Sequence, residues 1–527
     1  MESVRTLYGG RGLTLVAILL AMTILIPLGV ILSSWWVVEA AVWHHLAETV
    51  LAELLVNTLL LAAGVGTGVM VLGSGLAWLT TLCQFPGRRF FDGVLILPLA
   101  IPAYVLAFTV LGFFDFGGPL QSWLSLVPGT VRLPNLRTPA WVITILVLVL
   151  YPYVYLLARG AFLQQGQRML EASRVLGRGP WGAFFSAALP MARPAIVVGA
   201  SLAVMEAMAD FGAVSVFNFN TFTTAIYKSW FGLFNLNAAA QLASLLLLFV
   251  LLLLTLERSM RGLARFHGAD GLRQPERIVL HGMAAFAAFA LCALVFLCAF
   301  LLPMGQLLVW AWQSMARDLD TRYGQLLGHT LLLGSGAALL TTSGAFLLAL
   351  AVRSGQRLRR WAVRVATLGY ALPGSVLAVG VMVSFAWLEK GLGFVLLTGS
   401  VAGLLLAYAT RFLAVAFGPL ESGMERIRPQ LAEAAITLGC SGTALIRRIY
   451  LPILRPSLLT ALLMVLVEVM KEMPATLLLR PFGWDTLAVR IFEMTSEGEW
   501  QRAALPAVTL VLAGLLPVLL LLRRSGR

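Results

Sequence analysis

The sequence predicts an all-α polytopic membrane protein with about 12 transmembrane helices, arranged as two parallel six-helix repeats. Three observations predict this fold: the composition is very apolar, the apolar residues form long blocks, and the second half of the chain repeats residues of the first. Of the 527 residues, 60% are hydrophobic and 12% are charged. A soluble domain carries about 45–50% apolar and about 25% charged residues, so this excess does not fit inside a soluble core.

Twelve apolar blocks are long enough to be membrane spans, which need about 20 residues each. They lie at 13–33, 55–83, 92–114, 138–160, 193–217, 236–256, 281–303, 328–351, 364–388, 397–418, 455–479 and 503–523. We expect helices rather than strands, because an open sheet leaves backbone groups unpaired in lipid. The first block is expected to be a retained anchor, since no small-residue cleavage site follows it.

The basic residues predict the orientation of these spans. If the N-terminus is cytoplasmic, 28 of the 38 Lys and Arg residues fall in inner segments counted with the adjoining span ends, nine fall in outer loops and one, Lys471, lies deep within a span. Because cytoplasmic loops are enriched in Lys and Arg, this bias predicts that both termini are cytoplasmic. The net charge of +14 is therefore interpreted as a topology signal, and no nucleic-acid partner is expected.

The chain repeats itself at an offset of 262 residues, which aligns Glu171 with Glu433 and Leu189-Pro190 with Leu451-Pro452. Nearer the start of each half the offset is about ten residues larger, and Pro102 aligns with Pro373. The repeat predicts a first half at 1–262, a cytoplasmic linker at 263–280 and a second half at 281–527. Since an even number of spans separates the copies, they are parallel repeats, which can form a pathway where they meet.

Each half carries a matching loop between its fourth and fifth spans, at 159–193 and 419–455. A Glu-Ala pair is followed by a Gly, and then by Leu-Pro after eleven further residues. This pattern predicts a short amphipathic helix ended by Gly, then a second short helix, with Pro at the start of the next span. An apolar helix face on the inner surface requires lipid or a protein partner. The defining positions are Glu171, Ala172, Gly177, Glu433, Ala434 and Gly439.

These loops resemble the EAA loops of ABC importer permeases, and the match occurs twice in one duplicated chain. The first copy departs at one position, where Ser173 replaces the second Ala. The resemblance implies a type I ABC importer permease fold in the bacterial inner membrane. It also implies that the six defining residues dock an ABC ATP-binding subunit, present in two copies. A periplasmic substrate-binding protein would deliver cargo to the outer loops.

A more specific resemblance concerns the fifth span of each half and the residues after it. Ala209–Phe217, Thr221–Phe231 and Lys471–Ala488 are similar to fused ferric-iron permeases. This resemblance implies ferric iron as cargo, within a wider family that also imports thiamine, phosphonates and polyamines. These other cargoes therefore remain alternatives.

The chain carries no P-loop, since none of its three lysines follows a glycine. We expect no catalytic site and no cofactor in this chain, with ATP and Mg bound by the separate ATPase subunit. Its other expected contact is membrane lipid. The four cysteines have no CxxC spacing, so no zinc site is predicted.

Five ionisable residues lie well inside predicted spans: Glu206, Asp210, Glu468, Lys471 and Glu472. A charge at a helix centre is unfavourable by about 2.5–3.5 kcal/mol, so such residues face a protein interior or a water-filled cavity. The four-residue spacing predicts that each pair of carboxylates shares one helix face, and Lys471 could pair with Glu468. Two roles stay open: lining the translocation pathway, with or without contact to a metal ion, or holding the two halves together through buried pairs and helix-capping bonds.

Two other function classes are compatible with twelve spans. A secondary transporter also often has two parallel six-helix halves, but it has no need for the paired loops. A structural or signalling membrane protein leaves the interior carboxylates unexplained. Co-purification of an ATPase distinguishes the first of these from an ABC permease.

Overall fold

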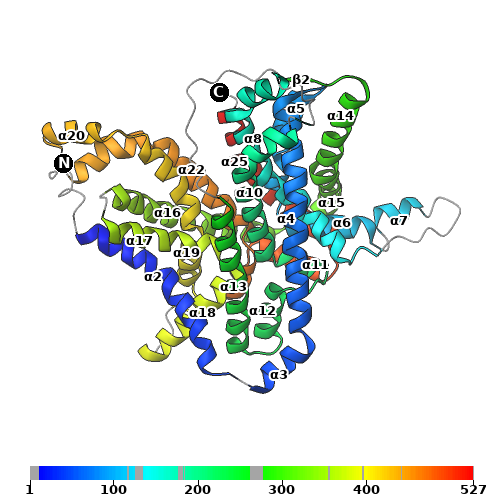
Figure 1. The fold of residues 1–527 in the computed structure, drawn as a ribbon. Coiled ribbons are helices and arrows are strands. Elements are labelled where there is room, and N and C mark those ends of the chain that lie inside the picture. Colours follow the sequence, from blue (N-terminus) through cyan, green and yellow to red (C-terminus); the bar gives the residue numbers. More distant parts are fainter. Residues whose placement is uncertain are drawn as a thin grey trace. The chain divides into compact units, whose positions relative to one another are not determined.

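The computed structural model describes residues 11–38, 40–115, 118–124, 135–175, 182, 184–261, 277–353, 356–393, 397–440 and 442–525 (Figure 1). Within these residues the regular elements are helices apart from two short strands, β1 (Cys83–Gln84) and β2 (Ile278–Val279), which pair in parallel. The predicted all-α fold is confirmed.

The elements of the first repeat follow the order of the sequence. They are α2 (Arg11–Ser33), η1 (Ser34–Trp36), α3 (Ala40–Thr49), α4 (Leu51–Leu82), α5 (Arg88–Val94), η2 (Leu97–Ala100), α6 (Ala103–Phe114), α7 (Pro119–Leu124), α8 (Pro139–Val175), η3 (Phe184–Ala188), α10 (Leu189–Ala209), α11 (Gly212–Val216), α12 (Phe222–Phe231) and α13 (Leu236–Arg261).

The second repeat has the same succession of long and broken helices. Its elements are α14 (Gly282–Phe296), η4 (Leu297–Leu301), α15 (Leu302–Asp318), α16 (Thr321–Arg353), α17 (Arg357–Ala366), η5 (Thr367–Ala371), α18 (Gly374–Leu392), α19 (Val401–Glu425), α20 (Pro429–Thr437), α21 (Thr443–Leu445), η6 (Ile446–Tyr450), α22 (Leu451–Lys471), α23 (Pro474–Leu479), α24 (Leu487–Ser496) and α25 (Trp500–Ser525). Thus α4 corresponds to α16, α5 to α17, and the broken pair α10–α11 to α22–α23.

Eleven helical segments among the described residues are long and apolar enough to cross a membrane. They overlap the first eleven predicted spans. The twelfth predicted span is occupied by α25, a 26-residue helix that is not among those eleven. The predicted third and ninth spans are each interrupted at a proline, because α6 begins after Pro102 and α18 begins after Pro373. Proline has no N–H to continue the preceding helix.

The helices form two compact units that are interleaved along the sequence. The first unit contains Met1–Trp43, Ile226–Leu247 and Leu319–Arg490, and the second contains His44–Ala225, Leu248–Asp318 and Ile491–Arg527. The first span of each repeat therefore packs with helices of the other repeat. This division differs from the halves 1–262 and 281–527, which describe the duplicated sequence.

In the first unit, α2 packs against α17 and α18, beside which it lies in Figure 1. Its buried face includes Ala17, Ala21, Ile24 and Ile31. The buried Arg359 of α17 donates a hydrogen bond from Nε to Thr14 Oγ1 at 2.8 Å. Gly380 of α18 permits the close approach, since a Cβ there would lie 2.7 Å from Ile31 Cδ1.

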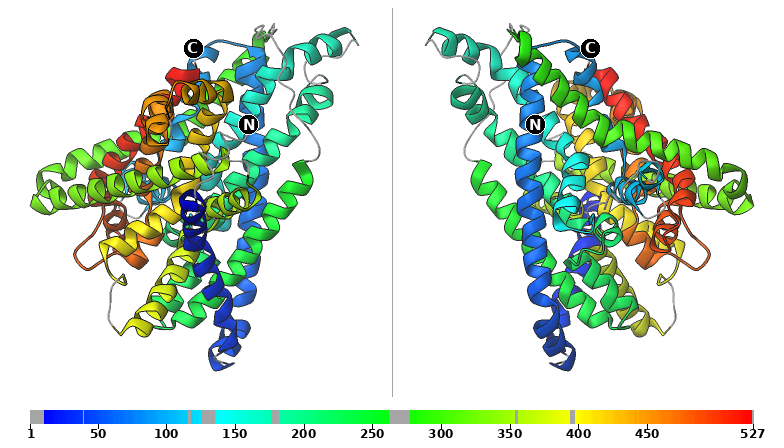
Figure 2. Two further views of the ribbon diagram at one scale, coloured as in Figure 1. Left: turned by 90° about the vertical axis from the view of Figure 1, so that its left-hand side faces the viewer. Right: turned by 90° about the vertical axis from the view of Figure 1, so that its right-hand side faces the viewer.

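In the second unit, α4 packs closely on α8, and both contact α10; α4 is the long blue helix in Figure 2. A Cβ at Gly73 of α4 would lie 2.7 Å from Val154 Cβ and 2.9 Å from the Tyr151 carbonyl oxygen. A Cβ at Gly199 of α10 would lie 2.8 Å from Val154 Cα. Small residues allow helix backbones to approach one another, which drives association of helices in lipid.

The close approach at Gly73 predicts a specific effect of substitution. Gly73→Ala is expected to lower stability by about 1–3 kcal/mol, because the added methyl forces α4 away from the α8 backbone. The measurement is thermal unfolding of the purified protein in detergent.

Gly75→Ala on the same helix is the matched control, since a Cβ there meets nothing within 4 Å. It is expected to be neutral or slightly stabilising, because Ala favours helix by up to about 1 kcal/mol over Gly. Equal destabilisation by both variants would contradict the close packing at Gly73.

Candidate functional site

The fifth span of the first repeat breaks at Asp210. Helix α10 ends at Ala209, Asp210 is extended with ψ of 129°, and α11 begins at Gly212. Asp210 Oδ1 accepts hydrogen bonds from the backbone N–H groups of Ala213 at 2.8 Å and Val214 at 3.2 Å. The carboxylate thereby caps α11 at its N-terminus, where helix N–H groups lack partners within the helix.

The fifth span of the second repeat breaks at the equivalent position, Glu472. Helix α22 ends at Lys471, Glu472 is extended with ψ of 114°, and α23 begins at Pro474. Glu472 Oε1 accepts a hydrogen bond from the Ala475 N–H at 3.0 Å. Both repeats therefore use a carboxylate to cap the helix that follows the break.

Threonine hydroxyls satisfy the backbone carbonyls at both breaks. Thr223 Oγ1 donates to the Asp210 carbonyl oxygen at 2.7 Å, and Thr476 Oγ1 donates to the Glu472 carbonyl oxygen at 2.6 Å. The Thr476 hydroxyl also lies 2.6 Å from the hydroxyl of the buried Tyr408 on α19. The donors and acceptors that the breaks release are thus paired within the protein.

Glu472 has a buried cationic partner, Arg411 of α19. The Arg411 Nε lies 3.2 Å from Glu472 Oε2, and both side chains are buried. Gly374 leaves room for this pair, since a Cβ there would lie 2.6 Å from Glu472 Oε1. Sequence reasoning missed Arg411, which it counted with the inner end of the predicted span 397–418; its position seven residues before that end was a signal that could have identified it.

The five interior residues predicted from the sequence lie on the two broken fifth spans or directly at the breaks. Glu206 lies on α10, and Glu468 and Lys471 lie on α22, all three partly buried. Asp210 and Glu472 are the C-cap residues of these helices, so each side chain leaves the last turn before the backbone changes direction. That each shares a helix face with Glu206 or Glu468 stays a prediction. Asp210 and Glu472 serve as helix caps, but each caps a helix of its own repeat, so these bonds do not join the two halves. Their contribution to a pathway, and the Glu468–Lys471 pair, stay predictions.

Within the described part of the chain, no group of three or more His, Cys, Asp or Glu side chains could hold a metal ion. Asp210 and Glu472 instead direct carboxylate oxygens at backbone N–H groups.

The second predicted loop contains α20, which carries Glu433 and Ala434 on its exposed surface. The last residue of α20 is Thr437, and Gly439, two residues further on, has a φ of +81° in the left-handed region. The Gly439 N–H donates to the Ile436 carbonyl oxygen and the Cys440 N–H donates to the Ala435 carbonyl oxygen, both at 2.9 Å. These two bonds form a Schellman motif and confirm that Gly ends this helix.

Two leucines on and just after α20 are exposed. The segment that precedes the helix is held by an arginine. Leu438 is 85% exposed and Leu431 is 46% exposed. Arg353, the last residue of α16, donates to the carbonyl oxygens of Ile427 at 2.7 Å and Met424 at 3.3 Å. Its guanidinium also lies 5.2 Å from the ring centroid of the buried Tyr450. Arg353 therefore fixes the segment that leads into α20.

The first predicted loop is described in part. Glu171 and Ala172 lie in the last turns of α8, which runs without interruption from the fourth span to Val175. Gly177 lies outside the described residues.

The second loop connects directly to the fifth span. We predicted a separate short helix before Leu451-Pro452, but Thr443–Lys471 forms one continuous helical segment of 29 residues. It contains a π-turn, η6, immediately before Leu451-Pro452, and η3 occupies the same place before Leu189-Pro190. Because proline lacks an N–H, the widened turn accommodates it without ending the helix.

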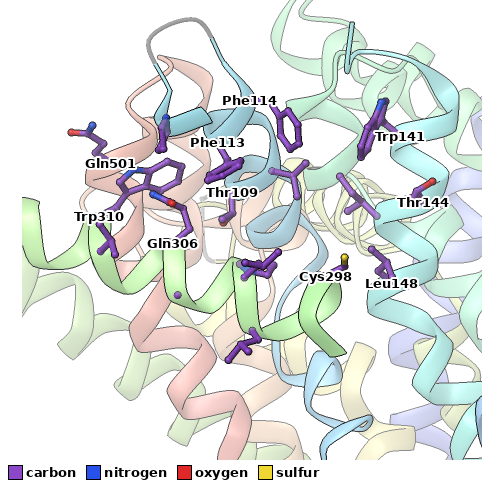
Figure 3. Close-up of a pocket in the computed structure, with 18 of the residues that line it drawn as sticks. Thr109, Phe113, Phe114, Trp141, Thr144, Leu148, Cys298, Gln306, Trp310 and Gln501 are labelled. Atoms are coloured by element: carbon purple, nitrogen blue, oxygen red, sulfur yellow. The ribbon is translucent and has the colours of Figure 1, made fainter. Parts of the chain in front are cut away.

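The second unit contains a cavity of about 850 Å³ that is lined mainly by apolar side chains. In Figure 3, Phe113 and Phe114 of α6 lie between Trp141 of α8 and Trp310 of α15. None of the described residues that line this cavity carries a carboxylate. Hard cations prefer oxygen ligands such as carboxylates, so the cavity does not resemble a cation site.

Two segments of this chain, residues 69–266 and 341–526, match the family model described as the inner membrane component of binding-protein-dependent transport systems. The chain belongs to this family. Each match covers most of one repeat and includes one of the two predicted loops. The permease is thus the membrane component of an ABC importer, it has no catalytic role of its own, and it works with a substrate-binding protein.

Among its relatives, the permease is similar over almost its whole length to the Fe(3+)-transport system permease protein FbpB 2 of Haemophilus influenzae. The two are 29% identical over 517 residues, which cover 97% of each chain. The putative 2-aminoethylphosphonate transport system permease protein PhnV of Salmonella typhimurium is 31% identical over 34% of this chain and 66% of its own length. The sulfate transport system permease protein CysW of Escherichia coli is 33% identical over 28% of this chain and 49% of its own length.

The buried ion pair predicts a large effect of one conservative substitution. Glu472→Gln keeps an oxygen that can accept from Ala475, but it leaves the Arg411 guanidinium buried without a counter-charge. We expect a loss of about 3–5 kcal/mol in stability. Thermal unfolding in detergent measures it.

Two further variants separate charge from capping. Asp210→Asn also keeps a capping oxygen, and it is expected to change stability by about 1 kcal/mol or less. Adding Arg411→Met to Glu472→Gln should recover most of the loss, because no buried charge then remains. If this double variant is as unstable as Glu472→Gln alone, the ion pair is not the cause.

Proposed function

We propose that this chain is the permease of an ATP-driven importer that moves ferric iron into the bacterial cytoplasm. The observation that carries the proposal is the alignment with an iron(III) permease over 97% of both chains, which includes both repeats. The matches to phosphonate and sulfate permeases cover about a third of the chain or less. Thiamine, phosphonate and polyamine remain the alternative cargoes, and a secondary transporter is the weaker alternative mechanism.

Both termini are proposed to be cytoplasmic. The excess of Lys and Arg in alternate loops supports this orientation, which places both EAA loops on the inner side. The halves 1–262 and 281–527 are each proposed as one permease half, joined by a cytoplasmic linker at 263–280. The same orientation directs the outer loops toward a periplasmic binding protein.

The two EAA loops are proposed to dock two copies of an ABC ATP-binding subunit. The residues proposed to make this contact are Glu171, Ala172, Gly177, Glu433, Ala434 and Gly439. The exposed Leu431 and Leu438 on and beside α20 support docking, since apolar surface of this kind is typically covered by a partner.

Movement of α20 would reach the membrane interior through the continuous helix from Thr443 to Lys471. At 1.5 Å per residue, 29 residues extend about 43 Å, longer than the hydrocarbon core of a bilayer. The helix ends directly before Glu472, where the span breaks. ATP-driven closure of the ATPase would in this way change the position of the break.

The interior residues Glu206, Asp210, Glu468, Lys471 and Glu472 are proposed to border the translocation pathway. Ionisable groups in spans face protein or water rather than lipid. The capping bonds of Asp210 and Glu472 support a positioning role: these carboxylates fix the helices beside the pathway and do not hold cargo tightly. Weak contact suits a permease, which must release what it transports.

The docking role predicts that Gly177→Leu combined with Gly439→Leu abolishes uptake while the protein still inserts. A branched side chain in the left-handed region is unfavourable by about 1–2 kcal/mol, so the end of α20 would move. The measurements are ATP-dependent uptake in proteoliposomes containing the ATPase and binding protein, and the protein level in membranes.

Gly418→Leu is the control for this variant. Gly418 is exposed on α19 and a Cβ there meets nothing within 4 Å. It should leave uptake unchanged. Uptake at the normal rate by the double variant would count against the docking role.

Cargo is tested in a strain that lacks this gene. We expect the deletion to reduce growth when ferric iron is limiting, and to reduce accumulation of radioactive iron supplied as the ferric ion. Growth with 2-aminoethylphosphonate as phosphorus source serves as the contrasting condition. Normal iron accumulation together with failure on the phosphonate would assign the alternative cargo and leave the ABC permease mechanism unaffected.

A further inference from the structure

Helix α17 is a short basic helix between the second and third spans of the second repeat. It follows α16, whose span ends at Arg353, and it precedes α18. Its inner face is buried and includes Arg359, Ala362, Val363 and Ala366. Its outer face is exposed and consists of Arg357, Leu358, Arg360, Trp361 and Arg364. Because α17 joins the end of one candidate span to the start of another, we expect it to lie at the level of the membrane surface.

The exposed face of α17 combines charge with large apolar groups. Leu358 is 58% exposed and Trp361 is 54% exposed. The Arg364 guanidinium lies 5.8 Å from the centroid of the Trp361 ring. Tryptophan rings settle at the level of lipid headgroups, and arginines on the same face reach the phosphates. A helix face with both arginines and large apolar side chains is better suited to contact with an anionic lipid surface than to full exposure to water.

The first repeat provides an internal comparison. At the offset that aligns Pro102 with Pro373, the buried Arg88 of α5 matches the buried Arg359, and the exposed Arg89 and Phe90 match Arg360 and Trp361. Arg357 and Arg364, however, match Pro86 and Gly93. Both repeats therefore have a surface helix with an aromatic and an arginine, but α17 carries two additional cations.

We propose that the exposed face of α17 binds the headgroup of an anionic phospholipid, with Arg357 and Arg364 selecting it over a zwitterionic one. Charge complementarity supports this occupant, since three arginines share one face with an interfacial tryptophan. On the proposed orientation α17 faces the cytoplasmic leaflet, where basic segments beside a span are attracted to anionic lipids. The binding does not depend on which cargo is transported.

The experiment titrates the full-length protein in detergent with dioleoyl phosphatidylglycerol or dioleoyl phosphatidylcholine, and native mass spectrometry resolves the lipids bound. The wild type is expected to bind phosphatidylglycerol more tightly than phosphatidylcholine. Arg357→Gln with Arg364→Gln should lose this preference at its tightest site by about fivefold for each arginine. Arg357→Lys with Arg364→Lys should retain it, because the charges are kept.

The matched control is Arg317→Gln with Arg322→Gln, which removes two exposed charges from outside α17. This control should bind phosphatidylglycerol as the wild type does. Thermal unfolding without added lipid checks that all variants are folded. Equal lipid preference in the α17 variant and the wild type, or equal losses in the variant and the control, would overturn the proposal.

A protein partner is the competing occupant of this face. If the glutamine variant loses co-purification of the ATPase while its preference for phosphatidylglycerol is unchanged, the face belongs to that subunit and the lipid proposal is wrong. If lipid preference falls while the ATPase still co-purifies, the lipid proposal is supported.

Discussion

The capping of a broken membrane helix by a carboxylate is the interaction on which the rest of the structure depends. Backbone donors and acceptors inside a bilayer must be satisfied by the protein, because no water is present to pair with them. Asp210 and Glu472 supply the acceptors at the two breaks, and Thr223 and Thr476 supply donors to the carbonyls. A helix can stop within the span because these side chains replace its missing hydrogen bonds.

The two breaks differ in charge even though they share this geometry. Glu472 faces the buried Arg411, which is accommodated by the absence of a side chain at Gly374. Asp210 meets the backbone N–H groups of α11 at two positions. The two halves therefore share the carboxylate cap at the break, but they differ in the groups that compensate the negative charge of the carboxylate.

The first span of each repeat lies in the compact unit that contains spans of the other repeat. This arrangement follows from the same need to bury helix faces. Helix α2 is apolar all round, so its sequence does not specify which neighbour it contacts. Its small residues Ala17 and Ala21 fit the surface formed by α16, α17 and α18, and Arg359 pairs with Thr14. The fused chain joins the two repeats covalently, and the interleaved packing links them a second time through their spans.

The sequence by itself determined the all-α membrane fold, the duplication, and the end of α20 at Gly439. These features depend on composition and on short-range chemistry: apolar length sets the spans, and a glycine at the end of an amphipathic segment adopts positive φ. The tertiary structure alone decided where the fifth spans break, that Thr443–Lys471 is one helix, and that α2 packs on the second repeat. Hydropathy reports only that a residue is apolar, whereas a break, a widened turn or a helix neighbour depends on hydrogen-bond partners distant in sequence, such as Tyr408 for Thr476. The Arg411–Glu472 pair belongs to the same class, because it joins residues that are 61 positions apart in the chain.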